Sequence, residues 1–170
     1  IRNSGSSRIM DFINTTVGNR VENCRIIGYN TTSTSSTYYL IYQNSTATQD
    51  NNNEFRNNLF ENGSAGIFWN GASTSPYEQG MIIENNRFIN QAAYPIYLTY
   101  NNGAIIRDNY IDNSQNGYSS SYGIYLSYNY NNTRVERNDI RTKRYGMYFN
   151  YLNGSSAQRA VVANNFINVT

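Results

Sequence analysis

The sequence contains no histidine, a single cysteine and a single lysine among its 170 residues. Without histidine, every mechanism that depends on imidazole is excluded, including Ser-His-Asp triads, Cys-His pairs and histidine-ligated zinc or haem. Cys24 has no second cysteine with which to form a disulfide or a zinc site. No glycine-rich phosphate-binding motif of the P-loop or dinucleotide-binding type occurs. We therefore expect no cofactor and no metal ion.

Residues that favour helices are also scarce, with five Leu and six Glu besides the one Lys, so a helical bundle is excluded. No stretch approaches 18 consecutive apolar residues, and membrane insertion is therefore not expected. Thirteen basic residues against eleven acidic ones give a net charge of +2. This balance predicts neither a nucleic-acid partner nor a polybasic membrane-binding patch.

Asparagine and tyrosine are abundant instead, at 30 and 17 residues. Hydrophobic residues make up 39% of the chain and aromatic residues 15%, which argues against disorder. Seven Asn-x-Ser/Thr sequons begin at Asn14, Asn30, Asn44, Asn62, Asn131, Asn153 and Asn168. Chance explains many sequons in such a sequence, so they give weak support to an extracellular or cell-surface location.

A repeat runs through the chain. In six segments an apolar residue is followed three positions later by Asn or Cys and five positions later by a second apolar residue, starting at Val21, Phe55, Ile83, Ile106, Val135 and Val162. A second apolar motif precedes each segment, at residues 9–12, 39–42, 66–69, 95–98, 123–126 and 146–149. Each period thus predicts three short strands, and stacked periods would bury one continuous core.

The inward side chains of successive coils can be aligned in columns. The first column is Val21, Phe55, Ile83, Ile106, Val135 and Val162, and the second is Ile26, Phe60, Phe88, Ile111, Ile140 and Ile167. The third column is Met10, Leu40, Ile67, Ile96, Ile124 and Met147, paired with Phe12, Tyr42, Trp69, Leu98, Leu126 and Phe149. Like residues are predicted to stack on like residues in each column.

Between the first two columns, one position is asparagine in five of the six coils. It is occupied by Cys24, Asn58, Asn86, Asn109, Asn138 and Asn165. Asparagine tolerates left-handed backbone angles at tight bends, and its amide can bond the next coil. We therefore expect an internal asparagine ladder in which Cys24 replaces one rung.

The pattern resembles the right-handed parallel β-helix superfamily, the pectate-lyase-like solenoids built of parallel β-helix repeats. The corner motifs NNRFIN (85–90) and DNYIDN (108–113) and the strand motif GIYL (123–126) carry this resemblance over nearly the whole chain. It implies an all-β, right-handed parallel β-helix of about six coils with three short parallel sheets. It does not specify an activity, because the superfamily contains lyases, hydrolases, epimerases, phage tailspikes and adhesins. A leucine-rich repeat is the alternative fold, but the segments between strands lack a helical period.

Neither end of the sequence has a recognisable cap. We expect residues 1–170 to form a single β-helix segment of a longer protein, open at both ends. End-to-end or lateral self-association is the alternative use of such open ends.

The charged residues are predicted to pair between coils. Glu22, Arg56, Glu84, Arg107 and Glu136 alternate in sign at one outward position, and Arg20 is expected to face Glu54, Asp108 to face Arg137, and Asp112 to face Arg141. Asp11 and Asp139 have no expected partner. Because the register brings no two unpaired carboxylates together, we predict no catalytic residues.

An outward aromatic column is the strongest functional signal. It consists of Phe68, Tyr97, Tyr125 and Tyr148 and is flanked by the polar residues Asn70, Thr99, Ser127 and Asn150, and by Gly66, Pro95, Gly123 and Gly146. Tyr100, Tyr128 and Tyr151 follow at the next corner. Exposed ring faces beside a bare strip would suit stacking with sugars, so polysaccharide or a cell-surface glycan is the predicted ligand. A purely structural tyrosine stack is the alternative.

These features predict a non-catalytic rod that acts as a spacer, adhesin or fibre-like module, with Phe68, Tyr97, Tyr125, Tyr148, Thr99, Ser127 and Asn150 as candidate carbohydrate-binding residues. The alternative function is a fragment of a polysaccharide lyase or glycoside hydrolase whose catalytic coils lie outside this segment. Ice binding is disfavoured, because the sequence has no two-column threonine array.

Overall fold

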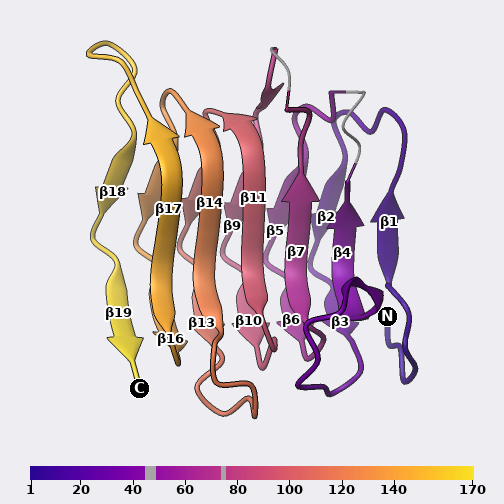
Figure 1. The fold of residues 1–170 in the computed structure, drawn as a ribbon. Coiled ribbons are helices and arrows are strands. Elements are labelled where there is room, and N and C mark those ends of the chain that lie inside the picture. Colours follow the sequence, from indigo (N-terminus) through magenta and orange to yellow (C-terminus); the bar gives the residue numbers. More distant parts are fainter. Residues whose placement is uncertain (45–48, 74–75) are drawn as a thin grey trace.

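The computed structural model describes residues 1–44, 49–73 and 76–170 and shows a solenoid built from parallel strands (Figure 1). Each coil contributes strands to three sheets, where they pair with the corresponding strands of neighbouring coils. The only helix within these ranges is a single 3₁₀ turn, Ser36–Tyr38. The prediction of an all-β parallel solenoid with three sheets is confirmed.

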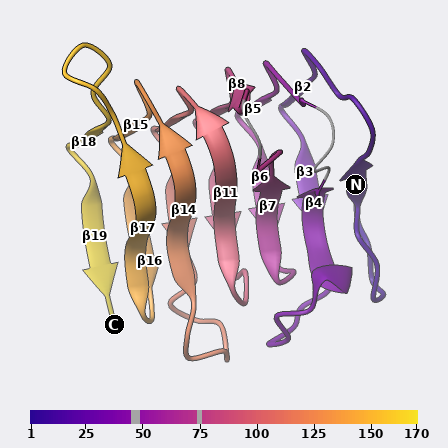
Figure 2. The same ribbon diagram turned by 45° about the horizontal axis from the view of Figure 1, so that its top comes forward.

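Sheet A contains the longest strands and faces the viewer in Figure 1. Its order is β1 (Met10–Phe12), β4 (Tyr39–Gln43), β7 (Ala65–Asn70), β11 (Tyr94–Asn102), β14 (Tyr122–Tyr130) and β17 (Tyr145–Asn153), with β8 (Glu78–Gln79) also paired to β11. The colours in both figures run in order along the rod, so neighbouring strands of sheet A come from successive coils (Figure 2).

Sheets B and C consist of strands of only three or four residues. Sheet B contains β2 (Arg20–Glu22), β5 (Glu54–Arg56), β9 (Ile82–Glu84), β12 (Ile105–Arg107), β15 (Arg134–Glu136) and β18 (Val161–Ala163). Sheet C contains β3 (Arg25–Ile27), β6 (Leu59–Glu61), β10 (Arg87–Ile89), β13 (Tyr110–Asp112), β16 (Asp139–Thr142) and β19 (Phe166–Val169). A three-residue strand directs only its middle side chain inward, which makes these sheets strictly periodic.

The core follows the predicted columns in sheets B and C. The inward residues of the four middle coils are fully buried in both sheets, and they are Phe55, Ile83, Ile106 and Val135 in sheet B and Phe60, Phe88, Ile111 and Ile140 in sheet C. In the last coil the column residues Val162 and Ile167 are 47% and 45% exposed. Like residues stack within the columns, as predicted. For example, the rings of Phe60 and Phe88 stack with centroids 4.8 Å apart.

The predicted column in sheet A is wrong by one residue in β4. Ile41, not Leu40, pairs with Ile67, and Gln43 pairs with Trp69. The cause is the corner before this strand, where the Leu40 side chain fills space left by two glycines. Adjacent residues Leu40 and Ile41 are therefore both buried, and simple alternation fails.

The asparagine ladder is present at the corner between sheets B and C. The Asn109 side-chain oxygen accepts hydrogen bonds from the backbone and side-chain amides of Asn86, at 3.0 and 3.1 Å. The Asn109 side-chain nitrogen donates to Ile83 in the previous coil and to Asn138 in the next, both at 2.9 Å. The same pattern repeats at the other rungs, and the backbone N–H of Cys24 donates to Asn58.

The left-handed backbone conformation lies one residue earlier than expected. Positive φ angles of 53–57° occur immediately before each ladder position, at Asn23, Asn57, Asn85, Asp108, Arg137 and Asn164. Asparagine and aspartate tolerate this conformation, whereas arginine rarely adopts it. Arg137 forms a bidentate ion pair with Asp108 one coil away, with both contacts at 2.7 Å.

Candidate ligand-binding surface

The charged residues of sheets B and C form ion pairs, as predicted in outline. Arg20 contacts Glu54 at 2.8 Å, and the Asp108–Arg137 pair holds the pKa of Asp108 below its usual value. Arg56 forms an ion pair with Glu54 at 2.8 Å and also contacts Glu84. The Arg56 hydrogen bond is the main reason that the pKa of Glu54 is lowered. Paired groups of this kind stabilise a surface and leave little free charge for a ligand.

Several pairings differ from the prediction. Asp11 and Asp139 do have partners, since Arg8 and Arg141 lie 3.1 Å from their carboxylates. Asp112 lies beside Arg141 in the strand register, as predicted, but its carboxylate accepts hydrogen bonds from Ser114 and forms no ion pair with Arg141 among the described residues. Residues two apart on a strand share a face, so a long arginine side chain reaches a carboxylate on its own strand as easily as one on the next coil.

The same explanation applies to the outward column of alternating charge. Glu136 binds Arg134 of its own strand with contacts of 2.7 and 3.0 Å. Glu22 lies 3.9 Å from Arg20. Glu84 follows the prediction, because Arg107 one coil away lies 2.6 Å from it.

Two carboxylates meet inside the core, which the sequence analysis did not predict. Asp50 and Glu78 are 1% and 0% exposed, and both accept hydrogen bonds from the side-chain amide of Gln43. The Trp69 indole N–H donates to Glu78 at 2.5 Å, and Thr16 donates to Asp50. Burial, together with the nearby Asp50 carboxylate, raises the pKa of Glu78 to about 8.

Because both carboxylates are buried, this pair has no access to a substrate.

Within the described ranges, no three Asp, Glu or Cys residues form a group that could hold a metal ion. Among the same residues, no helix is long and apolar enough to cross a membrane.

Sheet A carries three rows of aromatic rings on its outer side, which we call the aromatic face. The central row is Tyr42, Phe68, Tyr97, Tyr125 and Tyr148; the leading row is Tyr39, Tyr94, Tyr122 and Tyr145; the trailing row is Tyr100, Tyr128 and Tyr151, with Tyr77 beside it. The strand register places equivalent residues of the central row directly beside each other. The face therefore contains more rings than the seven named from the sequence, because the leading row joins it and Tyr42, predicted to point inward, pairs with Phe68 in the central row.

The rings stack face to face along the rod. In the central row, Tyr97 lies 4.3 Å from Phe68 and 4.7 Å from Tyr125, with interplanar angles of 8°. The trailing row has the same geometry, with Tyr128 lying 5.0 Å from Tyr100 and 4.7 Å from Tyr151. The expectation of open ring faces is therefore wrong, because stacked rings present their edges and hydroxyl groups instead.

The polar residues beside the central row bond to each other. Thr99 and Ser127 are only 3% and 5% exposed. The Thr99 hydroxyl donates to Asn70, and the Asn150 amide donates to the Ser127 hydroxyl at 3.1 Å. These groups serve as spacers between rows of rings rather than as exposed hydrogen-bonding groups.

The small residues near the central row also differ from expectation. Gly66, Pro95, Gly123 and Gly146 are buried and do not form an outward strip. A Cβ atom at Gly123 would lie 2.5 Å from Ile140, and one at Gly146 would lie 2.2 Å from Ile167. Glycine is needed here because sheet C approaches the backbone of sheet A closely.

The trailing row has a strained backbone. Tyr100, Tyr128 and Tyr151 have φ angles of 53–57°, a region that large side chains rarely occupy. Most other corners of the same chain use asparagine or glycine in this conformation. Three tyrosines in register at the strained position indicate that their rings serve a purpose that the backbone alone does not require.

The phenol groups of Tyr94, Tyr97 and Tyr125 remain protonated well above neutral pH. Burial, reinforced by neighbouring tyrosines, raises the pKa of Tyr94 to about 12 and that of Tyr97 further. The pKa of Tyr125 is raised for the same reasons. The hydroxyl groups therefore stay uncharged and able to donate hydrogen bonds.

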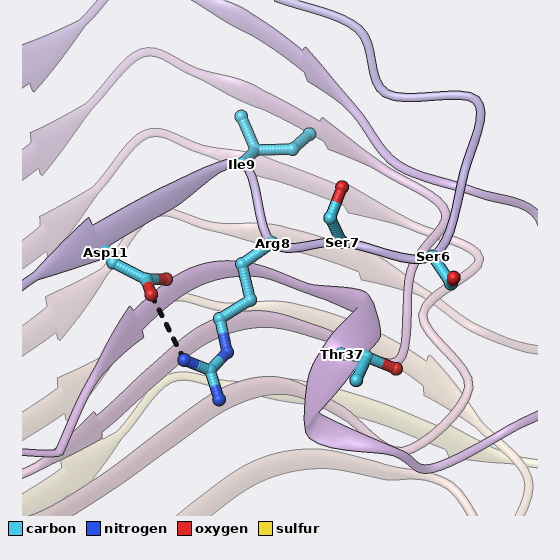
Figure 3. Close-up of a pocket in the computed structure, with 6 residues that line it drawn as sticks. All are labelled: Ser6, Ser7, Arg8, Ile9, Asp11 and Thr37. Atoms are coloured by element: carbon cyan, nitrogen blue, oxygen red, sulfur yellow. Dashed lines mark hydrogen bonds and ion pairs between the residues drawn. The ribbon is translucent and has the colours of Figure 1, made fainter.

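A cavity of about 500 Å³ lies at the N-terminal end of the aromatic face. Ser6, Ser7, Arg8, Ile9, Asp11 and Thr37 line it, and Figure 3 shows Arg8 reaching toward Asp11 between the two chain segments. The Arg8 guanidinium carbon lies 3.6 Å from the centre of the Tyr42 ring, so the planar guanidinium continues the central row.

Sequence reasoning found the central and trailing rows but not the leading row, although a tyrosine three residues before Tyr97, Tyr125 and Tyr148 was a visible signal. The cavity had no such signal, because Arg8 lies outside every repeated motif.

Comparison with known proteins agrees with this architecture. No curated protein and no solved structure matches the chain. A family model described as "Right handed beta helix region" matches residues 40–170. The matched range contains most of the coils and most of the aromatic face. This chain therefore belongs to the right-handed β-helix family.

Proposed function

We propose that this chain is a non-catalytic section of an exported or cell-surface protein, and that its aromatic face binds a polysaccharide. The observation that carries the proposal is the segregation of side chains among the sheets. Three in-register rows of rings lie on sheet A, while most ion pairs lie on sheets B and C.

The chemistry of the face suits a sugar polymer. Sugars present C–H patches together with many hydroxyl groups, and tyrosine edges offer carbon surface together with a phenol donor and acceptor. Because the rings are already fixed by stacking, little side-chain freedom would be lost on binding. Rows that repeat once per coil, about 4.8 Å apart, favour a ligand that also repeats.

Support for export comes from the sequence. Asparagine sequons are numerous, and Asn153 lies in an exposed segment that continues through Ser155. The sequon at Asn44 continues into residues outside the described ranges.

Affinity electrophoresis in gels containing single polysaccharides tests the proposal. Neutral polymers such as dextran, mannan and xyloglucan would be compared with the acidic polymers alginate and polygalacturonate. We expect at least one neutral polymer to retard the chain. Tyr97→Phe combined with Tyr125→Phe should weaken retardation about tenfold, because two phenol hydrogen bonds are lost while both rings remain.

Tyr110→Phe is the matched control. Like Tyr97 and Tyr125, Tyr110 is half-buried, but its ring packs against the guanidinium groups of Arg87 and Arg141, and it lies on sheet C. The proposal is wrong if no polymer retards the wild-type chain, or if Tyr110→Phe weakens binding as much as the sheet A variant.

The enzymatic alternative is tested in the same samples. Release of reducing ends or of unsaturated products, lost in Asp108→Asn or Asp139→Asn, would support a lyase or hydrolase. The ion pairs of these carboxylates with Arg137 and Arg141 favour a structural role for them.

A further inference from the structure

We infer that the cavity beside Arg8 and Asp11 binds one uncharged sugar unit with neighbouring hydroxyl groups, at the end of the central row. The inference rests on the proposed function in taking a sugar as the ligand, but it assigns a separate site with its own residues.

The position of the cavity links it to the aromatic face. Asp11 pairs in register with Tyr42, the first ring of the central row. Arg8 stacks on the Tyr42 ring itself, with its guanidinium carbon 3.6 Å from the ring centre. A polymer lying along the central row would therefore reach this cavity at its N-terminal end.

The hydrogen-bonding groups of the cavity suit a pair of neighbouring hydroxyls. The Arg8 Nη1 donates to Asp11 Oδ2 at 3.1 Å, and its Nε donates to the Ser36 carbonyl at 3.1 Å. Among the described residues, the Arg8 Nη2 and the Asp11 Oδ1 have no hydrogen-bond partner, which leaves one donor and one acceptor of this ion pair available. One hydroxyl can accept from the guanidinium while its neighbour donates to the carboxylate.

The remaining lining adds hydroxyl groups. Ser6 and Thr37 both lie on the side of Arg8 opposite Asp11, whereas the Ile9 side chain points away from Arg8 (Figure 3). A volume of about 500 Å³ is typical of small-ligand sites. The Asp11 carboxylate already neutralises Arg8 and would repel a second carboxylate, so an uncharged sugar is favoured over a uronic acid.

Ligand-observed NMR titration of the intact chain tests the inference. The probes are the methyl glycosides of glucose, galactose and mannose, methyl 3-deoxyglucoside, which lacks neighbouring hydroxyls around C3, and glucuronate. We expect at least one neutral glycoside to bind, with at least tenfold weaker binding of the 3-deoxy compound and of glucuronate.

Arg8→Ala and Asp11→Ala should each weaken binding of the neutral glycoside at least tenfold. Arg25→Ala is the control, because Arg25 forms an exposed ion pair with Glu61 at 3.0 Å and does not line the cavity. Circular dichroism would verify that each variant retains the β-sheet content of the wild type.

The two proposals fail in different ways. If polysaccharide retards wild type and Arg8→Ala equally and no methyl glycoside binds, the end site is refuted while the aromatic face stands. If a methyl glycoside binds in an Arg8-dependent manner but no polysaccharide is retained, the end site stands and the proposed function is refuted. Tighter binding of glucuronate than of every neutral glycoside would also overturn the inference.

Discussion

At the scale of single residues, the buried carboxyl of Glu78 ties stability to pH. It is fully buried beside Asp50, and its pKa of about 8 lies well above the 4.5 of an exposed glutamate. Between these two values the folded state holds a proton that the unfolded state has released. The free energy of unfolding therefore falls as pH rises from about 4.5 to about 8, and this contribution is constant outside that window.

Glu78→Gln should remove this dependence, because the amide cannot ionise and can still accept from the Trp69 indole. The variant should gain several kcal/mol relative to wild type between pH 4.5 and pH 8, at about 1.4 kcal/mol per pKa unit. Urea unfolding at a series of pH values measures the difference. Parallel curves for the two proteins would contradict the assigned protonation.

The asparagine ladder concentrates stability in single amides. Asn109→Ala removes the acceptor for two buried N–H groups of Asn86. We expect a loss of about 3–5 kcal/mol in the free energy of unfolding. Asn168→Ala, at an exposed position of the last strand, should cost less than about 0.5 kcal/mol. Equal urea midpoints for the two variants would show that the ladder is not stabilising.

At the scale of elements, β11, β14 and β17 bend at a tyrosine in left-handed conformation. The cost of this conformation is about 1–2 kcal/mol for each ordinary residue. Stacking with neighbouring rings returns a similar amount, about 0.5–1.5 kcal/mol per pair. The free-energy cost of the backbone conformation and the gain from ring stacking therefore nearly cancel. Replacing one of these tyrosines should change the free energy of unfolding only slightly.

Tyr128→Asn separates folding from binding at this bend. Asparagine relieves the strained backbone but removes the ring between Tyr100 and Tyr151. We expect the free energy of unfolding to change by less than about 1 kcal/mol, since the two effects oppose each other. Polysaccharide retardation should weaken several-fold. A large loss of stability together with unchanged binding would assign the trailing row a structural role only.

How much of each element could be predicted depends on strand length. In sheets B and C, three-residue strands between asparagine corners leave one possible inward residue, so the columns through Phe55 and Phe60 were predictable. In β4, the run Tyr39–Gln43 begins with three consecutive buried residues, and the corner packing of Leu40 decides the register. Such packing involves glycines distant in sequence and leaves no periodic signal.

At the scale of the whole molecule, charged and aromatic side chains lie on different sheets. Paired charges cover most of sheets B and C, and stacked uncharged rings cover sheet A. The buried Asp50–Glu78 pair could not be predicted, because two corner segments of unequal length bring these residues together. Repeat alignment compares equivalent positions only, and these two residues occupy no equivalent positions.

This separation of charged and aromatic side chains predicts how ligand binding depends on salt concentration. A ligand held by uncharged rings should bind with nearly the same affinity at 50 mM and 500 mM sodium chloride, because screening acts on charges. A polyanion held by arginines would lose affinity steeply over that range. Isothermal titration with the best-retained polysaccharide measures this, and a tenfold loss would contradict an uncharged contact surface.

Amide chemical-shift mapping tests binding at the aromatic face most directly. The chain, labelled with ¹⁵N, would be titrated with an oligosaccharide of the best-retained polymer. The account predicts shifts concentrated in β11, β14 and β17, including Tyr97, Tyr125 and Tyr148, with sheets B and C unchanged. Shifts confined to sheets B and C, or no shift at saturating oligosaccharide, would contradict it.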